Sequence, residues 1–199
     1  MQSMAAASFD PHLAAVPSPW VVRFAHLVSP AARVLDVACG GGRHALFFAA
    51  RGCMVDAVDR DAALAAVFSD QPRVRFLAAD LEGGPWPYPG RRFDAVVVTN
   101  YLHRPLFADL LEAIADGGVL LYETFAVGNE AFGRPSNPAH LLAARELLEV
   151  VGRRLHVLAY EDGVVARPRP ARVQRLCALR GPVALEKLAL EADAPLGGG

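Results

Sequence analysis

Short apolar runs rich in valine and leucine recur along the chain, and their spacing is the feature that most constrains the fold. They are continuously hydrophobic, a pattern typical of strands covered on both faces in a parallel sheet. Segments of helical character lie between several of them. The predicted strands are residues 34–37, 54–58, 74–77, 93–98, 119–122, 155–160 and 173–179, and the predicted helices are residues 44–51, 61–68, 106–114 and 138–151. This alternation predicts an α/β fold with a doubly wound, mostly parallel sheet.

The end of the chain departs from the alternation. No helical segment separates the last two predicted strands, which are joined by a loop containing the proline-rich sequence RPRP at 167–170. Such a loop is typical of an antiparallel pair, here at the edge of the sheet. Residues 192–199 end in three glycines and are predicted to form a mobile tail. A length of 199 residues fits one domain, and we expect 1–199 to form it.

Composition excludes several classes of protein. The 20 basic and 21 acidic residues give a formal net charge of −1, so no basic excess is available to hold a nucleic-acid backbone or an anionic membrane. The three cysteines, Cys39, Cys53 and Cys177, are far apart, so neither a disulfide framework nor a metal site is predicted. The first residues lack a charged segment before an apolar one, and no apolar run is long enough to cross a bilayer. We therefore expect a soluble cytoplasmic protein.

A glycine-rich turn follows the first predicted strand. The sequence VLDVACGGGRHA at 34–45 ends a strand, turns on glycines and starts a helix. Glycine permits positive φ and close approach of a ligand, and the first N–H groups of the helix then face that ligand. The spacing of Gly40, Gly42 and Ala45 also matches the dinucleotide fingerprint. Asp36 favours a cationic ligand, because a carboxylate near the turn would repel a pyrophosphate.

Two more aspartates end the next two predicted strands. Asp59 follows the run 55–58, and Asp80 follows the run 76–79. Asp59 is predicted to accept hydrogen bonds from two ribose hydroxyls, and Asp80 from an adenine amino group. The alternative is that these aspartates are helix N-caps, which is plausible for one of the three but poor for all of them.

Residues 33–127 resemble the core of the class I adenosylmethionine-dependent methyltransferases. VLDVACGGGR resembles their first motif, VDAVD their second and AAD their third, although this chain has Ala38 where the motif usually has glycine. The stretch 123–138 is similar to the small tellurite-resistance-type bacterial enzymes. The resemblance implies a seven-stranded sheet with an antiparallel edge strand, adenosylmethionine as methyl donor, and a helical cover over the donor site from residues 1–32. It implies donor contacts at Asp36, Ala38, Cys39, Gly40, Gly42, Arg43, Asp59, Arg60, Ala79, Asp80, Leu81 and Asn100.

Methyl transfer from a sulfonium is an in-line displacement, so the protein chiefly aligns the two partners. A general base is needed only when the acceptor must lose a proton. The fourth predicted strand leads into the segment that faces the methyl group in the family, and Asn100, Tyr101 and His103 are the catalytic candidates there. The alternative for His103 is that it caps or packs the following helix.

Substrate recognition is expected from polar residues further along the chain. The candidates are Arg104, Arg134 and Asn137. Arg104 can instead simply pair on the surface. Arg134 and Asn137 belong to a long loop that can also simply lead into the next helix, with Asn137 as its N-cap. Arg43 is equally suited to the donor carboxylate and to a surface salt bridge. His44 is predicted to pack in its helix, and His140 to be structural or exposed.

The favoured function is transfer of a methyl group from adenosylmethionine to a small-molecule nucleophile. Two alternatives stay open: a protein that binds the donor without turnover, and an RNA methyltransferase using arginines such as Arg91, Arg92 and Arg167. A nicotinamide dehydrogenase is disfavoured by Asp36 and by the lack of a Tyr-x-x-x-Lys pair, Lys187 being the only lysine. The sequence leaves open the acceptor, the use of a base, and whether the protein is a monomer or a homodimer.

Overall fold

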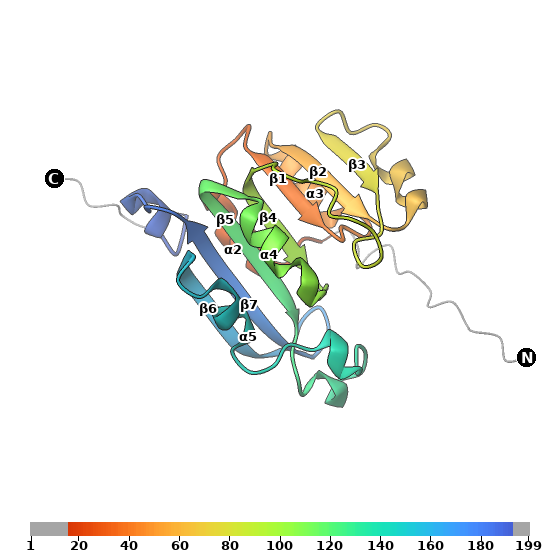
Figure 1. Ribbon diagram of the computed structural model, residues 1–199, viewed down its shortest axis with the longest axis vertical. Helices are drawn as coiled ribbons and strands as arrows, with labels where there is room; N and C mark the ends of the chain where they lie inside the picture. The colour runs from red at the N-terminus through yellow and green to blue at the C-terminus, as the bar shows by residue number, and fades with distance from the viewer. Residues whose placement is uncertain (1–15, 193–199) are drawn as a thin grey trace, which may run out of the picture.

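A seven-stranded sheet forms the centre of the structure, a computed structural model that describes residues 16–192 (Figure 1). The strands are β1 (Arg33–Val37), β2 (Met54–Asp59), β3 (Val74–Ala78), β4 (Phe93–Thr99), β5 (Ile114–Phe125), β6 (Leu155–Val165) and β7 (Ala171–Arg180). Their order is β3-β2-β1-β4-β5-β7-β6, and the first five strands in this order form four parallel pairs. The predicted fold class and all seven predicted strands are confirmed.

The last two strands form the predicted antiparallel pair at the sheet edge. β7 lies between β5 and β6 and is antiparallel to both. β6 and β7 are joined by the proline-rich turn, so the chain reaches the outer position first and then fills the gap beside β5. The result is that the loop at 166–170 lies at the same end of the sheet as the end of β5, beside Phe125.

Helices cover both faces of the sheet, as a doubly wound fold requires. The helices α2 (Pro19–Phe24), η1 (Ala25–Leu27) and α3 (Arg43–Ala50) pack on one face. The helices α4 (Phe107–Glu112) and α5 (Glu146–Val151) pack on the other, toward the viewer in Figure 1. Trp20 and Phe24 are buried in the first of these layers. The remaining short helices are η2 (Ala62–Phe68), η3 (Arg104–Leu106), η4 (Asn129–Ala131), η5 (Pro138–His140) and η6 (Leu185–Leu188).

The single helix predicted over residues 138–151 is wrong. Asn137 caps a short η5 by accepting from the Ala139 N–H, as predicted, but the helix stops after one turn. Leu142 then joins the edge of β5, its N–H donating to the Phe125 carbonyl at 2.9 Å. Leu141 and Leu142 are buried in the core in an extended conformation, and α5 begins only at Glu146. Tertiary burial here outweighs local helix propensity.

Two other helical segments also differ from the prediction. The segment after β2 is the 3₁₀ helix η2, and the helix predicted at 106–114 ends at Glu112 because β5 already starts at Ile114. Of the predicted N-terminal cover, residues 16–32 lie in the described part of the chain and 1–15 outside it; the predicted tail lies outside it from residue 193. No helix within residues 16–192 is long and apolar enough to cross a membrane.

Candidate functional site

The glycine-rich turn connects β1 to α3 through several residues of positive φ. Ala38 has φ +52°, Gly40 +51° and Gly42 +76°. Gly42 is needed for space as well as for conformation, because a Cβ there would lie 2.5 Å from the ring of Phe68. Ala38 adopts the left-handed conformation with a side chain, which costs about 1–2 kcal/mol relative to an unstrained backbone. The backbone of the turn is therefore strained at Ala38, and the turn requires glycine at position 42.

Asp59 holds the turn from the end of β2. Its Oδ2 accepts from the Gly40 N–H at 2.9 Å, and its Oδ1 accepts from the Asp61 N–H at 3.1 Å. Each carboxylate oxygen has a second lone pair, and the side chain lines a crevice beside the turn. Asp59 therefore fixes the loop and still offers acceptors to a ligand.

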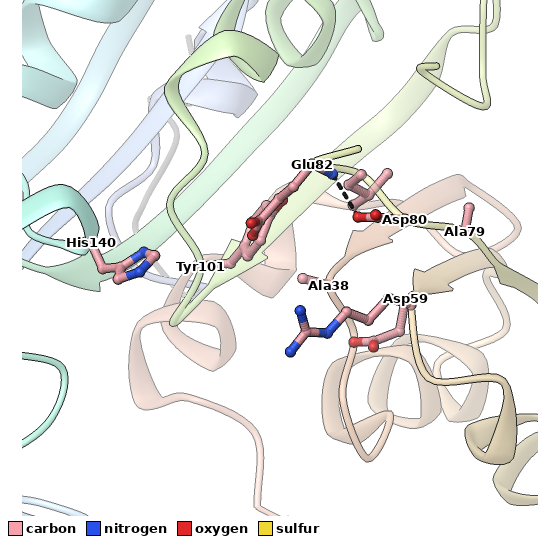
Figure 2. A pocket seen from close by; sticks show the side chains of 9 residues that line it. Ala38, Asp59, Ala79, Asp80, Glu82, Tyr101 and His140 are labelled. Atoms are coloured by element: carbon pink, nitrogen blue, oxygen red, sulfur yellow. Dashed lines mark hydrogen bonds between the residues drawn. The ribbon is translucent and has the colours of Figure 1, made fainter. Parts of the chain in front are cut away.

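The crevice has a volume of about 400 Å³ and lies over the carboxyl ends of β1, β2 and β3. Its walls combine residues from the three strand ends with residues from two later loops: Ala38, Asp59, Arg60, Ala79, Asp80, Leu81, Glu82, Tyr101 and His140. Figure 2 shows the carboxylates of Asp59 and Asp80 on opposite sides of the opening, with Tyr101 between them and His140. The structure thus brings together six of the predicted donor contacts and the catalytic candidate Tyr101.

Asp80 is exposed and ionised in this crevice. Its Oδ1 accepts from the Glu82 N–H at 2.9 Å. This bond and a second one from the Gly83 N–H lower the pKa of the carboxyl. Together with Asp59 and Glu82, it makes the crevice acidic.

Asp36 corrects the expectation of three carboxylates facing the ligand. It is 1% exposed, does not line the crevice, and accepts from the Ala45 N–H at 2.9 Å. Burial raises its pKa to about 7, with the Ala45 bond and the charge of Arg43 opposing the rise. Asp36 therefore ties β1 to the first turn of α3, although the N-cap residue of that helix is Gly42.

Cys39 and the glycines also lie behind the surface of the crevice. Burial raises the pKa of the Cys39 thiol, whose Sγ contacts the Gly40 carbonyl oxygen. Cys39, Gly40 and Gly42 are not among the residues that line the crevice. Their predicted contacts with the donor stay predictions.

A buried polar network lies on the other side of the turn. The Ser18 N–H donates to His44 Nε2 at 3.1 Å, and His44 Nδ1 lies 3.3 Å from Thr99 Oγ1, so Nδ1 carries the proton of a neutral ring. Burial and the nearby charge of Arg43 lower the pKa of His44 to about 3. The Ser18 hydroxyl donates to Glu123 at 2.8 Å. The prediction that His44 packs in its helix is confirmed.

A second pocket, of about 280 Å³, opens beyond this network. It is lined by Val16, Pro17, Ser18, Pro19, Arg43, Asn100, Glu123, Phe125, Val165, Arg167, Pro168, Arg169, Ala171, Val173 and Arg175. Arg43 is half-buried there, and burial lowers its pKa. Its predicted salt bridge within the first helix is not formed, and its Nη2 lies 3.5 Å from Thr99 Oγ1. Among residues 16–192 the guanidinium forms no ion pair, although the charges of Glu123 and Asp36 act on it.

A small cavity of about 210 Å³ lies between the crevice and the second pocket. It shares Glu82, Tyr101 and His140 with the crevice, and Asn100 and Phe125 with the second pocket. The three spaces therefore lie next to one another along the carboxyl ends of the parallel strands, and together we call them the trough. We call this small cavity the middle cavity.

The catalytic candidates differ in their positions along the trough. Asn100 has φ +55° and lines both the middle cavity and the second pocket. Tyr101 lines the crevice and the middle cavity, and its buried hydroxyl has no partner among residues 16–192. Burial raises its pKa, so the hydroxyl keeps its proton. His103 lines none of the three spaces.

Of the three substrate candidates, Arg104 lines neither the crevice, the middle cavity nor the second pocket. Its Nε and Nη2 form a forked ion pair with Glu146 at 2.7 and 2.9 Å, and its remaining N–H groups donate to the Ala139 and Leu141 carbonyls. Arg104 therefore fastens the start of α5. Arg134 and Asn137 line a further shallow opening with His140 and stay candidates.

Three kinds of residue in the trough were not predicted. Glu82 and His140 line the crevice; His140 is exposed, as expected, but no part in a site was predicted for it. Phe125 lies at the end of β5. Arg167 and Arg169 belong to the β6–β7 loop, and Arg167 was named only for the RNA methyltransferase alternative. The position of Phe125 at a strand end is a feature from which its place in the site could have been predicted. The β6–β7 loop lies beside Phe125 only because β5 pairs with β7.

Comparisons with known proteins agree with this geometry. A family model for a methyltransferase domain matches residues 34–118, fewer than half of the chain. No curated protein matches the sequence. TehB from Haemophilus influenzae is similar in structure, with a TM-score of 0.68 and 19% identity over 81% of this chain and 61% of TehB. This chain therefore spans less than two thirds of TehB.

Two further structures are similar over more of their length. A TehB-like adenosylmethionine-dependent methyltransferase from Corynebacterium glutamicum has a TM-score of 0.58 and 18% identity, over 81% of this chain and 87% of that one. The 1,6-didemethyltoxoflavin-N1-methyltransferase of Burkholderia thailandensis, solved with 1,6-didemethyltoxoflavin and S-adenosylhomocysteine, has a TM-score of 0.60 and 22% identity, over 82% and 76%. The chain thus has the Rossmann-like methyltransferase fold and resembles the class I adenosylmethionine-dependent methyltransferases, TehB-like proteins among them.

Proposed function

We propose that this protein transfers a methyl group from adenosylmethionine to a small-molecule acceptor, with the donor bound in the crevice. The observation that carries the proposal is the position of Asp59. Its carboxylate accepts a hydrogen bond from the Gly40 N–H and also lines the crevice opposite Asp80. This arrangement offers carboxylate acceptors to the hydroxyl and amino groups of an adenosine. It also disfavours a pyrophosphate at the same place.

The residues of the crevice fit the donor in chemistry and in size. A volume of about 400 Å³ lies within the range of small-molecule sites. The sulfonium and ammonium charges are matched by the acidic lining, and the buried, unpartnered Tyr101 hydroxyl has a proton to donate. Arg43, on the far side of the turn, is suited to the donor carboxylate.

Adenosylmethionine, when bound, supplies an already activated methyl group. The residues of this chain then have three tasks: Asp59 and Asp80 hold the adenosine, Asn100 and Tyr101 border the place where donor and acceptor meet, and Phe125 limits access of water. Orienting two reactants in this way lowers a barrier by about 7–11 kcal/mol in favourable cases. An acceptor that is already an anion at its nucleophilic atom needs no base, and the proposal assigns none.

Titration calorimetry tests the donor site. We expect the wild-type protein to bind adenosylmethionine and S-adenosylhomocysteine. Asp59→Asn removes the charge and one acceptor, and a hydrogen bond to a charged group is worth about 1.5–3 kcal/mol, so the dissociation constant should rise about 10- to 150-fold. Asp61→Asn is the matched control, because Asp61 lies two residues away and caps η2 outside the crevice.

The possible outcomes distinguish the proposed donor site from its alternatives. Weak binding in Asp59→Asn alone, with both variants folded, supports the proposal. Equal affinity of all three proteins would remove Asp59 from the site, and tighter binding of NAD than of adenosylmethionine would contradict the proposed donor.

A further inference from the structure

The second pocket has an apolar floor at the ends of three strands. Phe125, Ala171 and Val173 are between 5% and 9% exposed, and they form a separate core cluster with Leu141, against which Val165 packs. Pro17 and Pro19 add apolar surface from the start of α2. A floor of this kind is suited to an aromatic or aliphatic ligand, because pockets for small molecules are mostly apolar with a few placed polar groups.

The rim of the same pocket carries positive charge. Arg175 is neutralised by Glu123, at 2.5 Å, and by Glu161, at 3.3 Å. Arg167 and Arg169 are exposed, line the pocket, and form no ion pair with any carboxylate of residues 16–192. The pocket therefore has two unneutralised guanidinium groups at one end.

Arg169 is oriented toward the apolar floor. Its guanidinium carbon lies 5.9 Å from the centre of the Phe125 ring, and one Nη2 donates to the Arg134 carbonyl at 3.1 Å. The other N–H groups have no partner in the hydrogen bonds of the described residues. An aromatic ligand lying against Phe125 would place an anionic substituent within reach of them, and a guanidinium pairs with a carboxylate in a forked geometry.

The middle cavity lies between the second pocket and the donor crevice and shares lining residues with both. Asn100 and Phe125 line both the second pocket and the middle cavity, and Tyr101 lines the middle cavity and the crevice. A ligand anchored at Arg167 and Arg169 can thus present its opposite end past Asn100. That end is where a nucleophile would have to lie to meet the methyl group.

We propose that the second pocket binds the methyl acceptor, and that this acceptor is a small aromatic acid whose carboxylate meets Arg167 and Arg169 while its nucleophilic atom points from the other end of the ring toward Asn100. The inference rests on the proposed function. In the transfer, the nucleophilic atom forms a bond to the methyl carbon with its lone pair as the carbon–sulfur bond breaks. The electron pair of that bond stays on sulfur, giving the neutral thioether, and any proton on the nucleophile passes to water.

The test uses acids paired with their uncharged amides. With S-adenosylhomocysteine present, calorimetry measures binding of 4-hydroxybenzoate and 4-mercaptobenzoate against 4-hydroxybenzamide and 4-mercaptobenzamide. We expect each acid to bind at least about tenfold more tightly than its amide, the factor of a charged hydrogen bond. Methyl transfer from labelled donor to the two thiols should show the same preference.

The double variant Arg167→Gln/Arg169→Gln should abolish this preference and leave the affinity for S-adenosylhomocysteine unchanged. Arg153→Gln/Arg154→Gln is the matched control, because it removes two charges from exposed positions outside the trough. Both pairs lie on the surface, so thermal unfolding should be nearly unaffected.

Each outcome decides the matter. If S-adenosylhomocysteine does not bind the wild-type protein, the proposed function fails and this inference fails with it. If it binds but acids and amides bind equally, or the acids bind the Arg167/Arg169 double variant as well as the wild type, the inference alone is overturned. A preference that disappears only in that double variant supports it.

Discussion

Two buried groups on opposite sides of the glycine-rich turn should give the protein opposite pH dependences that largely cancel. His44 has its pKa lowered from 6.5 to about 3, chiefly by burial, and Asp36 has its pKa raised from 3.8 to about 7, also by burial. Both side chains are 1% exposed, so solvent screens neither. Between about pH 3.8 and 6.5 the unfolded chain holds a proton on His44 and the folded chain holds one on Asp36.

The sign of each effect follows from proton linkage. The free energy of unfolding rises with pH wherever the unfolded state binds more protons, by about 1.4 kcal/mol per pH unit for one group. His44 therefore makes the protein more stable as the pH rises from 3.8 to 6.5, and Asp36 makes it less stable over the same range. From pH 4.5 to 6.5 each contribution is about 3 kcal/mol, with opposite sign.

Two variants separate the pH dependence of stability that is due to His44 from the one that is due to Asp36. In His44→Gln, the free energy of unfolding relative to wild type should fall by about 3 kcal/mol between pH 4.5 and 6.5. In Asp36→Asn, which keeps an acceptor for the Ala45 N–H, it should rise by a similar amount. Urea denaturation followed by circular dichroism at four pH values measures both. Parallel pH profiles of the three proteins would refute the account of two buried groups with shifted pKa values.

Three further changes test the turn and its surroundings. Ala38→Gly should stabilise the protein by about 1 kcal/mol in urea denaturation, because glycine relieves the left-handed strain at a small entropic cost; a loss of stability would contradict this. Gly42→Ala should destabilise by about 1–3 kcal/mol more than Gly90→Ala, since both have positive φ but only the Cβ at Gly42 meets Phe68; equal losses would remove the steric argument. Arg104→Ala should lower stability by about 1–2 kcal/mol without changing the affinity for S-adenosylhomocysteine, because Arg104 binds Glu146 and two carbonyls; a selective loss of ligand affinity would restore it to the binding site.

The strands could be predicted because each carries its own signal. A strand buried on both faces reads as a continuous apolar run, as β1 and β4 do, whereas β3 at the sheet edge is only partly buried and was still recognisable from its apolar residues. The helices were predicted less well, since their form depends on distant contacts. Leu142 leaves the expected helix at 138–151 because the edge of β5 offers it backbone partners, which no local pattern reveals.

The candidate site, like the fold, could be predicted only in part from the sequence. Asp59 and Asp80 follow predicted strands directly, so their common location at one edge of the sheet could be inferred. Asp36 stands one residue before the end of β1, and that single position turns its side chain inward to α3. Arg104 was assigned by charge alone, and its partner Glu146 is 42 residues away along the chain.

The central claim is that Asp59 and Asp80 select an adenosine carrying a positively charged sulfur group. A crystal structure of the protein soaked with S-adenosylhomocysteine tests it most directly. We predict both ribose hydroxyls within hydrogen-bonding distance of Asp59 and the adenine amino group beside Asp80. Electron density for the ligand elsewhere, or a ribose turned away from Asp59, would contradict the claim.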